Sequence, residues 1–304
     1  MSKRTLYFLG ILATIVIGTY LYYKYCCKDC CKEQTEKTVQ ILTDNTGMGD
    51  YNIFNLSGND FNYTCHDNFR FLSNNFKNIQ PINDSINVGI EQLKSYFDKN
   101  ATEKLVITGY ALNTEKNTSA YPNLGIARAN DVKNYFVSKG FTANRFETLG
   151  ELRDVWKVEN DTVLGAVDFR IKQGEEVATE KPEDWNALKA KINANPLILY
   201  FNTNQSEINL TPKERQKIAD LSTYLDNVPE AKISCVGHTD GTGNRDTNIQ
   251  LGQGRADFAK EYLSKNGIIS DRIESSSKGP DEPIAANNTA EGKAKNRRTV
   301  VNLK

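Results

Sequence analysis

Residues 231–277 read AKISCVGHTDGTGNRDTNIQLGQGRADFAKEYLSKNGIISDRIESSS, and their apolar pattern sets the fold class. Ala231–Gly237 has the length and apolar content of a strand. The next periodic segment is predicted to open at Asn248 and to end at Gly267. Its apolar side chains share one helical face: Leu251, Phe258, Ala259, Tyr262 and Leu263. Ile273–Ser277 supplies another strand, and the order of strand, helix and strand predicts α/β architecture.

The residues on either side extend this pattern. Leu197–Phe201 and Thr299–Leu303 are apolar runs of strand length. Between them, Thr211-Pro212-Lys213-Glu214 has the form of a capping box with proline at the first helical position. Helices that alternate with strands in this way predict an α+β sandwich with the helices on one side of a mixed sheet.

The pattern occurs twice in the chain. Residues 90–112 align without gaps on residues 218–240, with six of 23 positions identical. Residues 124–146 align on residues 251–273, with eight of 23 identical. The offset is 128 residues in the first block and 127 in the second. We therefore predict two tandem βαβαββ domains of one fold.

The first residues predict a membrane anchor. Thr5–Tyr23 is an uncharged run whose helical length of roughly 28 Å is close to the thickness of a hydrocarbon core. A cleaved signal peptide has a shorter apolar region that ends in small residues, whereas this run ends in Tyr-Leu-Tyr-Tyr-Lys. It lacks the ionisable group that ion-driven motors and proton relays need inside the membrane. The prediction is one uncleaved transmembrane helix.

Composition excludes several function classes. Lys+Arg and Asp+Glu are both 38, so the chain has no electrostatic footprint for nucleic acid. A mean hydropathy of −0.56 excludes a multi-span transporter. Two histidines, and no G-x-S-x-G or H-E-x-x-H motif, leave little material for acid–base or metal chemistry. We expect no enzyme activity, no catalytic residue, no cofactor and no metal site.

Four cysteines follow the predicted anchor: Cys26, Cys27, Cys30 and Cys31. Outside a reducing cytoplasm, disulfides between neighbouring chains would make a covalent dimer. A zinc site and thiol acylation stay open as alternatives, although four sulfurs within six residues close poorly around one metal. Cys235 alternates with Ile233 on a strand face, which favours a place in the core, whereas the sequence leaves Cys65 undecided.

The stretch with chemical potential is Gly237-His238-Thr239-Asp240-Gly241-Thr242-Gly243, followed by Arg255 in the next helix. A carboxylate that faces a guanidinium across a small pocket suits a ligand with both an ammonium and a carboxylate. From spacing alone, a plain Asp240–Arg255 surface salt bridge fits equally well. His238 has no nucleophile or metal to act with, so we predict a positional role for it.

Residues 197–304 resemble an OmpA-like C-terminal domain, the peptidoglycan-binding module of Pal lipoproteins and MotB-type stators. The patterns F-x-x-N, G-H-T-D-x-x-G, N-x-x-L, R-A and N-R-R occur in that order. The resemblance implies that Asp240 and Arg255 hold the amino and carboxyl groups of diaminopimelate in the stem peptide. It also implies further lining residues: Asn204, Thr239, Asn248, Leu251 and Arg298. Gly252, where the family usually has serine, and Gly254 depart from the pattern without removing a charged contact.

The first copy keeps the apolar positions of the fold but not this pocket. Three pocket positions differ in the alignment: Leu112 stands opposite Asp240, Tyr110 opposite His238, and Leu164-Gly165-Ala166 opposite Asn296-Arg297-Arg298. Arg128 remains opposite Arg255, and we predict that it caps or braces its own helix. The first copy is therefore predicted to be degenerate and to act as a spacer or a protein-docking unit.

These features predict a non-enzymatic, single-pass protein of the inner membrane, with a cytoplasmic N-terminus and periplasmic domains. The second copy is expected to bind diaminopimelate-type peptidoglycan and so to tether the envelope to the wall. The alternative is a structural subunit of an envelope machine for secretion or motility, or of a stator-like one, in which the domains act as scaffold. Besides peptidoglycan and the membrane, the partners would be a second copy of the chain or envelope-complex proteins. The predicted boundaries are the anchor with its cysteines at 1–31, a linker with short strands at 32–68, the degenerate domain at 69–173, an acidic linker at 174–186 and the binding domain at 187–304.

Overall fold

The computed structural model describes residues 52–58, 60–173, 184–201 and 210–304. Several predicted features lie outside these residues: the helix Thr5–Tyr23, the cysteines Cys26, Cys27, Cys30 and Cys31, a strand at Lys37–Leu42 and most of the linker 174–186. None of the helices in the described ranges has the length and apolar character that crossing a bilayer requires. The described chain contains two mixed α/β segments, which we call the first segment (residues 52–173) and the second segment (residues 184–304).

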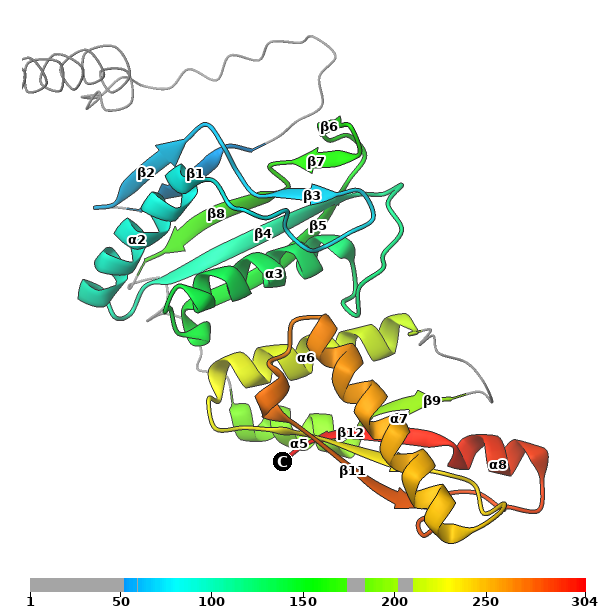
Figure 1. The fold of residues 1–304 in the computed structure, drawn as a ribbon. Helices are drawn as coiled ribbons and strands as arrows, with labels where there is room; N and C mark the ends of the chain where they lie inside the picture. Colours follow the sequence, from blue (N-terminus) through cyan, green and yellow to red (C-terminus); the bar gives the residue numbers. More distant parts are fainter. Residues whose placement is uncertain (1–51, 59, 174–183, 202–209) are drawn as a thin grey trace, which may run out of the picture. The chain divides into compact units, whose positions relative to one another are not determined.

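The second segment is built on a four-stranded mixed sheet in the order β11-β10-β12-β9 (Figure 1). Its strands are β9 (Leu197–Tyr200), β10 (Ile233–His238), β11 (Ile273–Gly279) and β12 (Arg298–Leu303). Strand β10 is parallel to β11 and antiparallel to β12, which is antiparallel to β9. The helices are α5 (Trp185–Ala194), α6 (Pro212–Asn227), α7 (Arg245–Lys265) and α8 (Ala290–Asn296), with a 3-10 turn, η3, at Ser270–Arg272.

Local sequence sets where these helices begin. The predicted capping box of Thr211 and Glu214 is present at the start of α6. Helix α7 begins at Arg245, three residues before the predicted start at Asn248, so that prediction is wrong. The side chain of Asn244 causes the earlier start, because it accepts hydrogen bonds from the backbone N–H groups of Asp246 and Thr247 in the first turn.

The helices cover one face of this sheet. Along β10, Ile233 and Cys235 are fully buried, whereas the residues that alternate with them are half-buried. Helix α7 packs on β10 and β11 (Figure 1). Gly237 of β10 closely approaches Gly252 of α7. A Cβ atom on Gly237 would overlap the carbonyl oxygen of Gly252. The glycine at 252, which departs from the family pattern, thus lies where strand and helix are in closest contact.

The first segment has a three-stranded mixed sheet in the order β5-β4-β8, with β4 parallel to β5 and antiparallel to β8. These elements are α2 (Asp84–Lys99), β4 (Lys104–Leu112), α3 (Leu124–Ser138), the 3-10 turn η2 (Ala143–Arg145), β5 (Phe146–Arg153) and β8 (Val167–Lys172). The smaller strands are β1 (Phe54–Ser57), β2 (Asn62–Cys65), β3 (Arg70–Leu72), β6 (Val158–Glu159) and β7 (Thr162–Leu164). Strands β1 and β2 lie within residues 32–68, for which the sequence predicts a linker with short strands. Much of the core is aromatic: Phe54, Phe69, Phe71, Phe97, Phe136, Phe146 and Phe169.

The two described cysteines are free thiols. Cys235 is fully buried in the second segment, as its place on the strand face predicts. Burial raises the pKa of the Cys235 thiol to about 12, so this residue acts as a small apolar core residue. Cys65 is partly buried in the first segment.

Candidate ligand-binding site

Asp240 follows the carboxyl end of β10, in the loop that leads into α7. Its Oδ1 accepts a hydrogen bond from the backbone N–H of Thr242 at 3.0 Å, and its Oδ2 accepts one from Nη1 of Arg297 at 2.9 Å. Burial raises the pKa of Asp240, but these hydrogen bonds outweigh burial and hold the pKa below its ordinary value. A carboxylate offers about four acceptor positions. The charged side chain therefore has room for a donor from a ligand.

Arg255 extends from α7 and is partly buried. Its Nη1 donates to the carbonyl oxygen of His238 at 2.9 Å, and its guanidinium lies 6.0 Å from the centre of the Phe201 ring. Within the described residues, Arg255 makes no other hydrogen bond and no ion pair with Asp240. The surface salt bridge that spacing allowed is therefore not formed there. The remaining guanidinium donors are suited to a carboxylate.

The charges around Arg255 favour an anion. Burial lowers the pKa of Arg255, the neighbouring Arg297 lowers it further, and Asp240 raises it. An arginine stays charged in proteins, so two cationic side chains lie near one another, and the one nearby carboxylate, Asp240, is paired with Arg297. An anionic group of a ligand would relieve the repulsion between the two guanidinium groups.

Arg297 and Arg298 differ in their surroundings. Arg298, which the resemblance places in the pocket, is only 5% exposed and donates to the carbonyl oxygens of Asn296 at 3.4 Å and Glu282 at 3.2 Å. The arginine bonded to Asp240 is Arg297, which the sequence analysis did not single out. Neighbouring residues at the start of a strand point to opposite faces, and this alternation is the signal that could have separated the two arginines.

The other predicted residues lie around the same loop. Thr239 is buried, and its hydroxyl has no hydrogen-bond partner among the described residues. Asn248 is buried and donates to the carbonyl oxygen of Thr242 at 2.9 Å, which ties the loop to α7. Leu251 is 53% exposed and lies one helical turn before Arg255 in α7. Asn204 lies outside the described residues.

Two linked amides, of Asn296 and Asn287, brace the loop. Asn296 is fully buried, and its Oδ1 accepts hydrogen bonds from the backbone N–H groups of Ile284 and Ala285. Its Nδ2 donates to Oδ1 of Asn287, which also accepts from the backbone N–H of Gly241 at 2.9 Å. The asparagine of the N-R-R pattern therefore fixes the loop and makes no contact with Asp240 among the described residues.

His238 is 3% exposed. Burial and the charge of nearby Arg298 lower the pKa of His238 to about 4, so its imidazole is neutral at physiological pH. Its backbone carbonyl oxygen accepts the hydrogen bond from Arg255, and its imidazole Nδ1 has no hydrogen-bond partner among the described residues, so the positional role of the side chain stays a prediction. Among the described residues, no group of three or more His, Cys, Asp or Glu side chains could hold a metal ion.

Residues 200–297 match the model of the OmpA family. These residues form an OmpA family domain. "Probable lipoprotein YiaD" of Escherichia coli strain K12 is 38% identical over 98 residues, which are 32% of this chain and 45% of that protein. "Peptidoglycan-associated lipoprotein" of Buchnera aphidicola is 36% identical over 103 residues, which are 34% of this chain and 58% of that protein. The chain thus spans about half the length of these curated relatives.

Part of the chain is also similar to a solved structure. The crystal structure of the peptidoglycan-associated lipoprotein from Burkholderia pseudomallei is 26% identical, with a TM-score of 0.32, and the similarity covers 35% of this chain and 89% of that chain. The family is one of non-enzymatic structural domains, which agrees with the prediction that the chain is not an enzyme. The match confirms the resemblance for the second segment, and the tandem copy stays a proposal.

Proposed function

We propose that the second segment binds peptidoglycan non-covalently through the diaminopimelate of the stem peptide. Asp240 accepts hydrogen bonds from the ammonium of diaminopimelate, and the guanidinium of Arg255 holds its carboxylate. The proposed pocket has five further members, of which Asn204 is outside the described residues: Asn204, Thr239, Asn248, Leu251 and Arg298. To these we add Arg297, because it holds the carboxylate of Asp240.

One observation carries this proposal: a charged Asp240 and a largely uncommitted Arg255 are held beside the same loop without neutralising each other. A zwitterionic ligand satisfies both charges, whereas a simple anion or cation satisfies one. The names of two relatives support the choice of ligand, the Buchnera lipoprotein above and "Peptidoglycan-binding protein ArfA" of Mycobacterium tuberculosis, 36% identical over 92 residues, 30% of this chain and 28% of that protein.

We further propose that the first segment is a tandem copy of the same domain. Two arginines at the ends of the 3-10 turns support this. Arg145 donates to the backbone carbonyls of Phe97, Asn100 and Glu103. Arg272 donates to the backbone carbonyls of Leu225, Val228 and Ala231, each 128 residues further along the chain. An identical brace in two unrelated folds would be a coincidence.

A glycine pair gives independent support. Gly109 of β4 approaches Gly125 of α3 so closely that a Cβ atom on Gly109 would overlap the carbonyl oxygen of Gly125. Gly237 of β10 and Gly252 of α7 make the same contact in the second segment. Both pairs follow the offsets of the sequence repeat. The same strand-to-helix packing thus recurs at equivalent positions.

We propose that the helix Thr5–Tyr23 anchors the chain in the inner membrane and that both segments lie in the periplasm. Peptidoglycan lies in the periplasm, so a second segment that binds it requires a cytoplasmic N-terminus. The chain would then tether the membrane to the wall. A reporter that is inactive in the periplasm, fused after Lys304, is expected to give no signal, and an active reporter would contradict this topology.

Co-sedimentation of the full chain in detergent with diaminopimelate-type sacculi tests the binding. We expect the wild type to pellet, and Asp240→Ala and Arg255→Ala to lose at least about tenfold in affinity, because each removes a charge-assisted contact. Arg245→Ala is the matched control, since Arg245 is 62% exposed and pairs with Asp281 at the surface. Sacculi with lysine in place of diaminopimelate lack the second carboxylate and should bind weakly. Retention of Asp240→Ala at the wild-type level would contradict the pocket.

A further inference from the structure

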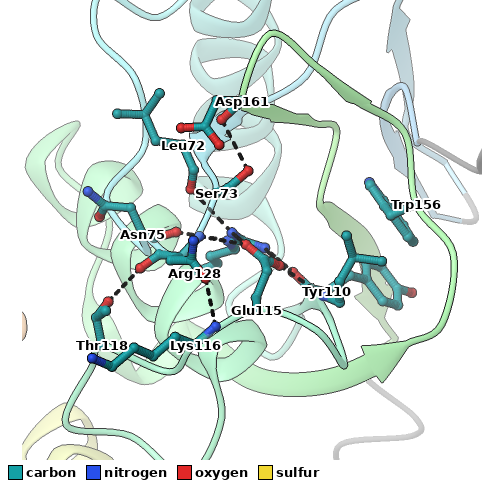
Figure 2. A network of polar contacts seen from close by, with 12 residues as sticks. Leu72, Ser73, Asn75, Tyr110, Glu115, Lys116, Thr118, Arg128, Trp156 and Asp161 are labelled. Atoms are coloured by element: carbon teal, nitrogen blue, oxygen red, sulfur yellow. Dashed lines mark hydrogen bonds and ion pairs between the residues drawn. The ribbon is translucent and has the colours of Figure 1, made fainter.

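Arg128 of the first segment lies at the centre of a filled polar pocket (Figure 2). Its side chain is fully buried, and Nη1 donates to the carbonyl oxygen of Tyr110 at 2.8 Å. In the sequence repeat, Tyr110 corresponds to His238, whose carbonyl oxygen accepts the equivalent bond from Arg255 at 2.9 Å. The two guanidinium groups therefore sit on their strands in the same way.

Arg128 meets a carboxylate of its own chain, whereas Arg255 meets none among the residues that the structure describes. Nη1 lies 3.0 Å from Oε2 of Glu115, and Nη2 lies 2.5 Å from Oε1, so the pair is bidentate and Glu115 is buried with it. Nε also donates to the carbonyl oxygen of Asn75 at 3.1 Å, and Nη2 to that of Leu72 at 3.5 Å. None of these partners belongs to α3, so the prediction that Arg128 braces its own helix is wrong.

Both carboxylate oxygens of Glu115 accept hydrogen bonds from the surrounding chain. Its Oε1 accepts from the backbone N–H of Asn74 at 2.9 Å, and its Oε2 from the backbone N–H of Leu112 at 2.8 Å. With the two guanidinium contacts, each carboxylate oxygen has two donors. A carboxylate has about four acceptor positions, so this pocket satisfies the whole group. Figure 2 shows the Glu115 side chain directed at Arg128.

We propose that Glu115 is a built-in substitute for a ligand carboxylate, so that the first segment retains a carboxylate site filled by its own chain. This rests on the proposed function, because it takes the site around Arg255 as the open counterpart. Leu112 stands where Asp240 would receive an ammonium, so the second half of a zwitterion site is also missing. One chain then has one open site for diaminopimelate, in the second segment.

Removal of the substitute carboxylate tests the proposal. In the full chain in detergent, Glu115→Ala leaves Arg128 buried without its counter-charge and should lower the melting temperature by about 10 °C. Acetate fits the vacated position and should restore at least half of this loss relative to chloride at equal ionic strength and pH. Trp156, stacked on Tyr110 at 4.7 Å, reports the transition by fluorescence in a Trp185→Phe background.

Two controls set the limits. Glu115→Gln fills the space with an amide, so it should melt several degrees below wild type and should not respond to acetate. Glu151→Ala removes a carboxylate that is 50% exposed and should change neither value. Equal melting of Glu115→Ala in acetate and in chloride would overturn the proposal. If Glu115→Ala fails to fold in both salts, Glu115→Gln decides, and a wild-type melting temperature for it would overturn the proposal.

A calorimetric titration with a soluble diaminopimelate muropeptide gives the stoichiometry. We expect one site per chain, and two sites would overturn the filled-site proposal. Absence of binding would count against the proposed function alone, because the melting experiments contain no peptidoglycan and still decide the role of Glu115.

Discussion

Arg297 and Arg298 are neighbours in the chain, but we expect their substitutions to affect different properties, ligand binding for Arg297 and thermal stability for Arg298. Arg297 holds Oδ2 of Asp240, so Arg297→Ala should weaken sacculus binding by roughly tenfold and change the melting temperature little. Arg298 is buried on backbone carbonyls, so Arg298→Ala should lower the melting temperature. Arg297→Lys keeps the charge without the planar fork and should bind at an intermediate level. Equal binding by wild type and Arg297→Ala would contradict the role given to Arg297.

The charged pair of the candidate site could be predicted from the sequence, but its partners could not. Asp240 and Arg255 stand in a recognisable order of motifs. The pairing of Asp240 with Arg297 depends on how β12 begins beside the loop, and no local pattern records that. For the first segment, the sequence indicated that Leu112 replaces the aspartate that would bind a ligand ammonium. It could not indicate Glu115, which reaches the guanidinium only after the chain between β4 and α3 has folded back.

At the scale of elements, strong local signals predicted the fold well. The capping box at Thr211 and the apolar run of β9 were found in place. Helices α5 and α8 were not predicted. Helix α8 reads AEGKAKN over seven residues, so it has no apolar face for periodicity to detect. The start of α7 was misplaced because Asn244 and Asn248 are both good capping residues, and only the structure shows which one caps.

Three glycines around α7 should respond differently to alanine. Gly237→Ala places a methyl group against the backbone of Gly252 and should cost about 2 kcal/mol or more. Gly252→Ala meets the hydroxyl of Ser277, which can turn away only by losing its hydrogen bond from the backbone N–H of Gly279, and it comes within 3.0 Å of the carbonyl oxygen of Gly237. Because a side chain yields more easily than backbone, Gly252→Ala should cost less than Gly237→Ala. Among the described residues, no atom beyond Gly254's chain neighbours and its own helix lies within 4 Å of the position that a Cβ would take there. Gly254→Ala should therefore stabilise the fold by about 0.5–1 kcal/mol through helix propensity. Urea unfolding of the full chain measures all three. A destabilised Gly254→Ala would contradict the open space around that position.

At the scale of the whole molecule, the two segments have the same arrangement of strands around β4 and β10 but differ in the surroundings of Arg128 and Arg255. The parallel and antiparallel neighbours of β4 are arranged like those of β10, and the arginine and glycine contacts recur at the repeat offsets. Among the described residues no carboxylate pairs with Arg255, whereas Glu115 pairs with Arg128. Under the tandem-copy proposal, selection has kept the packing contacts of both copies and the ligand contacts of one.

This shared frame leads to a quantitative expectation for Arg145 and Arg272. Each is partly buried and donates to three backbone carbonyls at equivalent places, so Arg145→Ala and Arg272→Ala should each lower the free energy of unfolding by about 2 kcal/mol. Urea titration followed at Trp156 and Trp185 samples both segments. Lys265→Ala, which removes an exposed pair with Glu261, is the control and should stay within about 0.5 kcal/mol of wild type. If only one of the two substitutions lowered the free energy of unfolding, the equivalent carbonyl contacts would not stabilise the two segments equally. That result would count against the tandem-copy proposal.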